Sequence, residues 1–188
     1  MANPLPVHMG SVKRILRYLK GAPNLKIAYS RDFNFELTGF CDASYGTGDP
    51  EKASSISGSI YFLSGGVVHF NSSFRKTTAQ SITMAELVAM STCAKQRIYL
   101  SSILGELGWK NFRSVRIFCD NKGALLLAGK GNYGNRPKHL AIRFAGLHDW
   151  ISQRQIIIDH VSTKKQLSDI LTNFCSRPIF STLLQAIF

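Results

Sequence analysis

Apolar and polar residues follow a helical period at the start of the chain. From Val12 to Leu19 apolar residues recur every three or four positions, and most of the Lys and Arg side chains between them fall outside that face. Gly21 and Pro23 then supply a typical helix end. The pattern predicts a basic amphipathic helix over residues 10–20, whose charged face is either an ordinary solvated surface or a surface that contacts phosphates.

The next segments have the composition of strands. Three runs rich in β-branched and aromatic residues are separated by turn-forming residues: Glu36–Asp42, Ser57–Leu63 and Gly66–Ser72. A polar loop over residues 45–54 and a tight Ser-Gly-Gly turn at 64–66 connect them. Short connections of this kind predict an antiparallel meander.

The second half of the chain alternates between helical and strand patterns. We expect a long helix over residues 78–107, strands over 114–119 and 155–162, and helices over 121–128, 140–154, 165–174 and 178–188. Strands that are separated by helices pair in parallel through crossovers. The predicted fold is therefore one α/β domain, with a mixed five-stranded sheet and helices on its faces.

Composition and charge favour a polyanionic partner. Hydrophobic residues make up 45% of the 188 positions, which is enough for a core, and 23 Lys and Arg against 11 Asp and Glu give a formal charge of +12. A strongly basic protein binds nucleic acid through counterion release. A membrane is the weaker choice, because the sequence has neither a run of about 18 apolar residues nor a signal-peptide core.

The cysteines indicate neither a zinc ribbon nor a disulfide framework. Cys41, Cys93, Cys119 and Cys175 lie far apart, and none belongs to a CxxC pair. We interpret them as reduced core residues, which favours an intracellular setting.

Four carboxylates stand where a hydrophobic element ends or turns. Asp42 and Asp120 each follow a predicted strand, Glu86 lies inside the long helix, and Asp169 lies in the last helical region. Each one alone is explained equally well by a helix cap or a turn. Together they suit two-metal hydrolysis, in which oxygen ligands hold two divalent cations about 3.5–4 Å apart, and Mg²⁺ suits an all-carboxylate site.

Five motifs in register resemble the ribonuclease H domain of copia-type retrotransposons. They are residues 39–44 (GFCDAS), 81–86 (SITMAE), 118–121 (FCDN), 138–140 (KHL) and 167–172 (LSDILT). Residues 12–21 look like the end of that family's reverse transcriptase region. The resemblance implies a ribonuclease H-like fold with strand order 3-2-1-4-5, a reverse transcriptase tail over 1–32 and a ribonuclease H domain over 33–188. It also implies catalysis and metal binding by Asp42, Glu86, Asp120 and Asp169.

The resemblance further implies an endonuclease that cuts the RNA strand of RNA/DNA hybrids during reverse transcription. It implies two Mg²⁺ ions, for which Mn²⁺ can substitute, and the reverse transcriptase region of the same polyprotein as a partner. The expected location is intracellular, both in a cytoplasmic virus-like particle and in the nucleus. Candidate substrate-binding residues are Ser44, Asn121, Arg75, Lys76, Lys138 and His139.

Departures from the family pattern leave two alternatives open. Met84 stands where the family usually has Glu, and Ala141 and Ala145 stand where it carries Asp and His. One alternative is a catalytically degenerate or host-adopted remnant that keeps the fold and binds nucleic acid. The other is an integrase or transposase core with three carboxylates, against which the meander and the fourth acid near the C-terminus argue.

Overall fold

The computed structural model describes residues 4–46, 55–75, 81–109, 112, 114–131 and 137–188. Along the chain the elements are α1 (Pro6–Gly21), β1 (Thr38–Ser44), β2 (Ser55–Leu63), β3 (Gly66–Arg75), α2 (Ile82–Glu106), β4 (Val115–Cys119), α3 (Lys122–Lys130), α4 (Lys138–Ser152), β5 (Ile156–His160), the 3-10 turns η1 (Thr163–Lys165) and η2 (Leu167–Leu171), and α5 (Arg177–Ile187). The predicted order of helices and strands is therefore confirmed.

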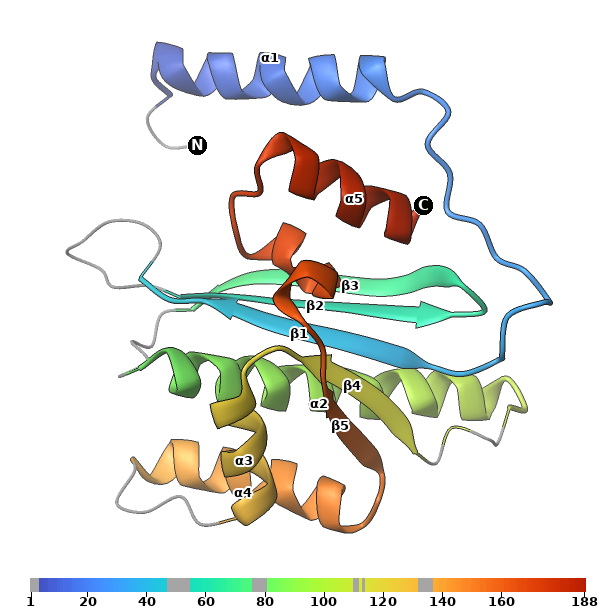
Figure 1. Cartoon of the computed structure of the whole chain (residues 1–188), viewed down its shortest axis with the longest axis vertical. Helices are drawn as coiled ribbons and strands as arrows, with labels where there is room; N and C mark the ends of the chain where they lie inside the picture. Colours follow the sequence, from blue (N-terminus) through green and yellow to red (C-terminus); the bar gives the residue numbers. More distant parts are fainter. Residues whose placement is uncertain (1–3, 47–54, 76–80, 110–111, 113, 132–136) are drawn as a thin grey trace.

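The five strands form one mixed sheet in the order β3-β2-β1-β4-β5. The β1–β2 and β2–β3 pairs are antiparallel, whereas the β1–β4 and β4–β5 pairs are parallel, as the helical crossovers predict. Ser64 and Gly65 have positive φ values of 51° and 81° and make the tight turn between β2 and β3. Because β1, β4 and β5 run in parallel, their carboxyl ends lie at one edge of the sheet (Figure 1).

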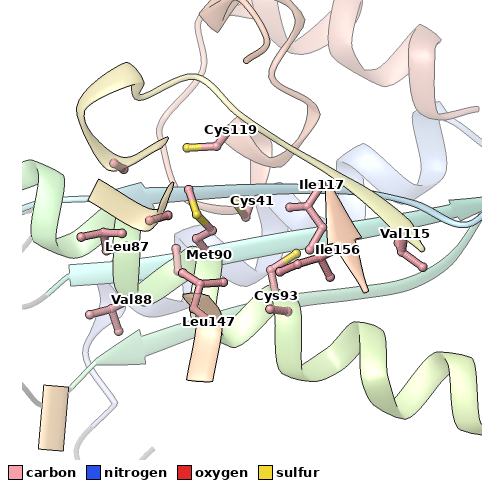
Figure 2. Packing of buried hydrophobic residues seen from close by; sticks show 14 of the residues in the cluster. Cys41, Leu87, Val88, Met90, Cys93, Val115, Ile117, Cys119, Leu147 and Ile156 are labelled. Atoms are coloured by element: carbon pink, nitrogen blue, oxygen red, sulfur yellow. The ribbon is translucent and has the colours of Figure 1, made fainter. Parts of the chain in front are cut away.

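One face of the sheet, which we call the α2 face, carries the main core. Helix α2 lies along it, and α3 and α4 lie beyond α2 (Figure 1). Ser81 caps α2 by accepting a hydrogen bond from the backbone N–H of Met84 at 3.2 Å. Figure 2 shows how side chains of α2, such as Leu87 and Met90, meet those of the strands, such as Ile117 and Ile156. This contiguous apolar core fixes α2 against the sheet.

The opposite face, which we call the α5 face, has a much smaller core. It is covered by η1, η2 and α5 (Figure 1), and its buried cluster consists of Ile60, Val67 and Ile187. A cavity of about 420 Å³ remains there, lined by residues that include Phe40, Phe118 and Leu183. The layer over this face is therefore thin and incompletely packed.

Helix α1 lies outside both layers. None of its residues is buried, and the Tyr18 ring meets the Phe180 ring of α5 edge-on at 6.0 Å between centroids. The chain after α1 is tied to the β2–β3 hairpin, because the Tyr29 hydroxyl donates to the carbonyl of Val67 at 2.6 Å and Ser30 N–H donates to the carbonyl of Ser64 at 3.1 Å. Among the described helices, none is both long and apolar enough to cross a membrane.

Two details differ from the sequence predictions. Strand β1 continues to Ser44, so that Asp42 lies within the strand rather than after it. The segment 165–174, predicted as a helix, contains the 3-10 turn η2 instead. The side-chain amide of Gln166 donates to the carbonyl of Cys41 at 2.9 Å and ties this segment to β1. A continuous α-helix would carry its next residues away from that contact.

Candidate metal centre

The sheet register brings two of the predicted carboxylates together. Phe40 of β1 pairs with Phe118 of β4 in parallel, so the same offset places Asp42 beside Asp120, which directly follows β4. Asp42 is only 4% exposed, and Glu86, in the second turn of α2, is equally buried. The parallel pairing of β1 with β4 makes this convergence possible.

The fourth carboxylate reaches the same place from the α5 face. Asp169 lies in η2 and hydrogen-bonds to Asp42 through its side chain. Two neighbours of Asp169 also bind Asp42: the Thr172 hydroxyl donates to its Oδ2, and the Asn173 amide donates to the same oxygen at 3.3 Å. Sequence reasoning missed both: Thr172 is the last residue of the motif that contains Asp169, and Asn173 directly follows it.

Asp120 has its own positioning contact. The Thr163 hydroxyl of η1 donates to Asp120 Oδ2 at 2.7 Å. Glu86, Cys119 and Asp120 each offer one ligand atom, and these three atoms lie within 4.8 Å of one another. The structure therefore brings together all four predicted acids and adds a thiol that the sequence analysis had assigned to the core.

Burial, together with the charges of neighbouring acids, disfavours the charged forms of Asp42, Glu86 and Asp169. Burial, followed by the charge of Asp42, raises the pKa of Glu86 from its usual 4.5 to about 10. Burial, followed by the charges of Asp42 and Asp120, raises the pKa of Asp169 to about 7. Burial also raises the pKa of Asp42, against the opposing effect of the Thr172 hydrogen bond.

This donor set fits hard divalent cations. Carboxylate oxygens are the ligands that Mg²⁺ and Mn²⁺ prefer. A cation among the four acids would favour the charged forms of Asp42, Glu86 and Asp169, which burial otherwise disfavours. Asp42, Glu86, Asp120 and Asp169 are the residues that would hold such ions.

No family model matches the chain. Its sequence is 32% identical over 187 residues to the retrovirus-related Pol polyprotein from transposon RE1 of Arabidopsis thaliana, an alignment that covers all of this chain and 13% of that protein. The chain belongs to the copia-type retrotransposon Pol family. It thus spans only a small part of the curated polyproteins that it matches.

One shorter relative and two solved structures complete the comparison. The secreted RxLR effector protein 161 of Plasmopara viticola is 33% identical over 100 residues, which are 53% of this Pol segment and 70% of the effector. The structure of RNase H1 from Halobacterium salinarum matches with a TM-score of 0.52 and 13% identity, over 73% of this chain and 94% of that one. The foamy viral protease-reverse transcriptase in complex with an RNA/DNA hybrid matches with a TM-score of 0.52 and 17% identity, over 79% of this chain and 22% of that one. The fold of this Pol segment is that of ribonuclease H.

The remaining predicted site residues of the Pol segment have different surroundings. Asn121 is the N-cap of α3, and its side chain accepts from the backbone N–H of Ala124 at 2.9 Å. Ser44 is buried at the end of β1. Lys138 and His139 are exposed in the first turn of α4. Lys76 falls outside the described residues.

Arg75 belongs to a basic cluster that sequence reasoning found only in part. Its Nη2 donates to the Thr92 hydroxyl of α2 at 3.3 Å, and Arg143 of α4 donates to the same hydroxyl and to Ser91 Oγ at 3.1 Å. Burial and then the charge of Arg143 lower the pKa of Arg75 to about 9, while Glu86 opposes that shift. Two cations held this close are suited to share an anionic group. Arg143 carried no motif of its own, and only the packing of α4 on α2 brings it here.

Proposed function

We propose that this Pol segment hydrolyses the RNA strand of RNA/DNA hybrids during retrotransposon reverse transcription. The convergence of four carboxylates at the carboxyl edge of a ribonuclease H sheet carries the proposal. The membership of this chain in the Pol family supports the proposal. The likeness of its fold to the foamy viral enzyme, whose structure contains an RNA/DNA hybrid, also supports it. The reverse transcriptase region of the same polyprotein is the natural partner.

Some residues of the chain would bind the metal ions, and others would orient the side chains that bind them. Asp42, Glu86, Asp120 and Asp169 would hold two Mg²⁺ ions, or two Mn²⁺ ions in their place. When bound, such ions lower the pKa of a water nucleophile and stabilise the leaving oxygen. Thr172 and Asn173 would keep one Asp42 oxygen in a fixed direction, because both donate hydrogen bonds to it.

Substrate binding would rest on charge and shape. The formal charge of +12 favours a polyanion, and Arg75 and Arg143 place two guanidinium groups on the α2 side of the acids. Contacts between Arg or Lys and phosphates position a duplex without reading its bases. Selection of a hybrid would come from duplex shape and the 2′-OH groups of the RNA strand, so cleavage should be independent of sequence.

The test is cleavage of a labelled RNA/DNA hybrid by the wild type and by Asp120→Asn. The variant should lose at least about 1000-fold in rate because an amide holds a divalent cation poorly, while its binding of hybrid in metal-free buffer should persist. Asp149→Asn is the matched control, since Asp149 is exposed on α4. If Asp120→Asn cuts as fast as the wild type, the metal-centre assignment is wrong.

A second candidate function has one specific observation in its favour. The RxLR effector aligns with this chain over most of its own length, so a related sequence also stands as a short separate protein. A host-adopted remnant that binds nucleic acid without cutting it is the corresponding proposal. It prevails if the wild-type protein binds hybrid but cuts neither with Mg²⁺ nor with Mn²⁺.

A further inference from the structure

We infer that this centre also takes a thiophilic divalent cation such as Zn²⁺, with the Cys119 thiolate as a ligand, and that this ion competes with Mg²⁺. The inference rests on the proposed function in one respect, because it concerns the regulation of the same metal centre. Its own basis is the mixed ligand set of Glu86, Cys119 and Asp120.

The three side chains come from two rigidly connected elements. Cys119 is the last residue of β4 and Asp120 follows it, while Glu86 extends from α2. The Cys119 sulfur lies 3.9 Å from Glu86 Oε2, and the ligand atoms of all three residues lie within 4.8 Å of one another. A tetrahedral ion with bonds of about 2.0–2.3 Å holds its ligand atoms roughly 3.3–3.8 Å apart, so the distance from the Cys119 sulfur to Glu86 is already close to the required spacing.

The backbone helps to hold the thiol at the centre. The N–H of Asn121 donates to the Cys119 sulfur at 3.5 Å, and Asn121 is itself fixed as the cap of α3. Figure 2 shows Cys119 at the end of β4, in the same buried cluster as Cys41 of β1. The sulfur therefore reaches the ion site without a change in the path of the strand.

The chemistry of this set differs from that of the four acids. Mg²⁺ takes oxygen ligands in near-octahedral geometry and gains nothing from a sulfur. Zn²⁺ binds thiolate, and three protein ligands leave its fourth position for water. On binding, the Cys119 thiol would release its proton to solvent, and the S–Zn bond would replace the S–H bond.

The two kinds of ion cannot share the centre freely. Zn²⁺ would use Glu86 and Asp120, which the proposed Mg²⁺ pair also needs. Asp42 and Asp169 alone would then remain to hold Mg²⁺. Transition metals bind a given site more tightly than Mg²⁺ does. Low concentrations of Zn²⁺ should therefore inhibit cleavage that depends on Mg²⁺.

The experiment titrates the 188-residue protein with Cd²⁺ as a spectroscopic substitute for Zn²⁺. A sulfur-to-cadmium charge-transfer band should rise to one equivalent in the wild type and should disappear in Cys119→Ser. Cys175→Ser is the matched control, because Cys175 is the cysteine near the Asp169 side of the centre and is partly exposed; it should keep the band. Competition with Zn²⁺ should show an apparent Kd raised about 100-fold by Cys119→Ser.

Several outcomes would overturn the inference. They are a wild type without the band, a band that survives in Cys119→Ser, and a band that depends on Cys175. If Cys119→Ser does not fold, X-ray absorption of the Zn²⁺-loaded wild type decides: one sulfur at about 2.3 Å is expected, and a shell of oxygen or nitrogen alone contradicts the inference.

The same titration separates this inference from the proposed function. If the protein shows the Cys119-dependent band but cuts no hybrid with Mg²⁺, the thiolate site is supported and the nuclease function is contradicted. A protein that cuts hybrid but shows no band loses only the thiolate site.

Discussion

The two faces of the sheet differ in how densely they are packed. On the α2 face one continuous core joins helix α2 to the strands, and α3 and α4 extend it. On the α5 face three buried residues form the cluster, and cavities of about 420 and 350 Å³ remain beneath the covering segments. Close packing makes an element rigid, and missing contacts make it easier to open locally.

This difference divides the metal centre. Glu86 comes from the α2 face and Asp120 from β4, whose buried side chains belong to that core. Asp169 comes from a short 3-10 turn on the α5 face and depends on hydrogen bonds to β1. The densely packed α2 face should therefore determine the positions of the ions. The residues of the less densely packed α5 face should affect the orientation of the Asp42 carboxylate.

The largest expected difference is in catalysis. Glu86→Gln should lower the hybrid-cleavage rate by more than about 1000-fold, or about 4 kcal/mol, because it removes a rigidly held ligand. Asp169→Asn should lower it by only about 10- to 100-fold, since the amide can still donate a hydrogen bond to Asp42 as protonated Asp169 does. Single-turnover rates at saturating Mg²⁺ measure both. Equal losses in the two variants would contradict the division of the centre.

The next effect is on stability. Leu87→Ala should reduce the free energy of unfolding by about 3–5 kcal/mol, because Leu87 is fully buried in the dense core. Leu183→Ala is the matched substitution on the α5 face and should cost about 1–2 kcal/mol, because Leu183, although buried, already borders a cavity. Urea unfolding monitored by circular dichroism compares them. A larger cost at Leu183 would show that the α5 face is better packed than its cavities indicate.

A third prediction concerns pH in metal-free buffer. Folding raises the pKa of Glu86 from 4.5 to about 10, so the neutral form is favoured in the folded state. The contribution of Glu86 to the free energy of unfolding is therefore most favourable below pH 4.5, and it is lost as the pH rises toward 10. Glu86→Gln removes this loss, and at pH 8 the variant should be more stable than the wild type by about 2 kcal/mol.

The control for this third prediction is the metal itself. Excess Mg²⁺ should stabilise the wild type more than Glu86→Gln, because ions that bind only the folded state add to its stability. Thermal unfolding at pH 5 and pH 8, with EDTA or with Mg²⁺, makes the comparison. If Glu86→Gln is less stable than the wild type at pH 8 in EDTA, the carboxylate is not held in an unfavourable environment.

The smallest effect should come from the N-terminal segment. Deleting residues 1–24 should change the free energy of unfolding by less than about 0.5 kcal/mol, because α1 contains no buried residue. Deleting residues 1–32 should cost about 1–2 kcal/mol, because it also removes the hydrogen bonds of Tyr29 and Ser30 to the hairpin. Loss of cooperative unfolding in the shorter deletion would place α1 in the core and contradict the proposed boundary at residue 32.

The sequence alone was sufficient for the architecture. Periodicity identified each strand within two or three residues, the crossover rule predicted that the fourth and fifth strands extend a mixed sheet, and the family resemblance implied the strand order. Secondary structure could be predicted from the sequence because the alternation of apolar and polar residues indicates which face of a strand or helix is buried. The sequence also identified Asp42 and Asp120 as candidate metal ligands, and the parallel pairing of β1 and β4 brings them together.

The chemistry of the centre was decided by tertiary structure. Segment 165–174 has a helical pattern but contains the 3-10 turn η2, and a hydrogen bond between Gln166 and Cys41, residues 125 positions apart, ties it to β1. The sequence analysis assigned Cys119 to the core, and Arg143 carried no motif of its own, but packing places them beside Glu86 and Arg75. A local pattern specifies which face of an element is buried, but hydrogen bonds and charge interactions between distant residues depend on positions that exist only once the elements have packed.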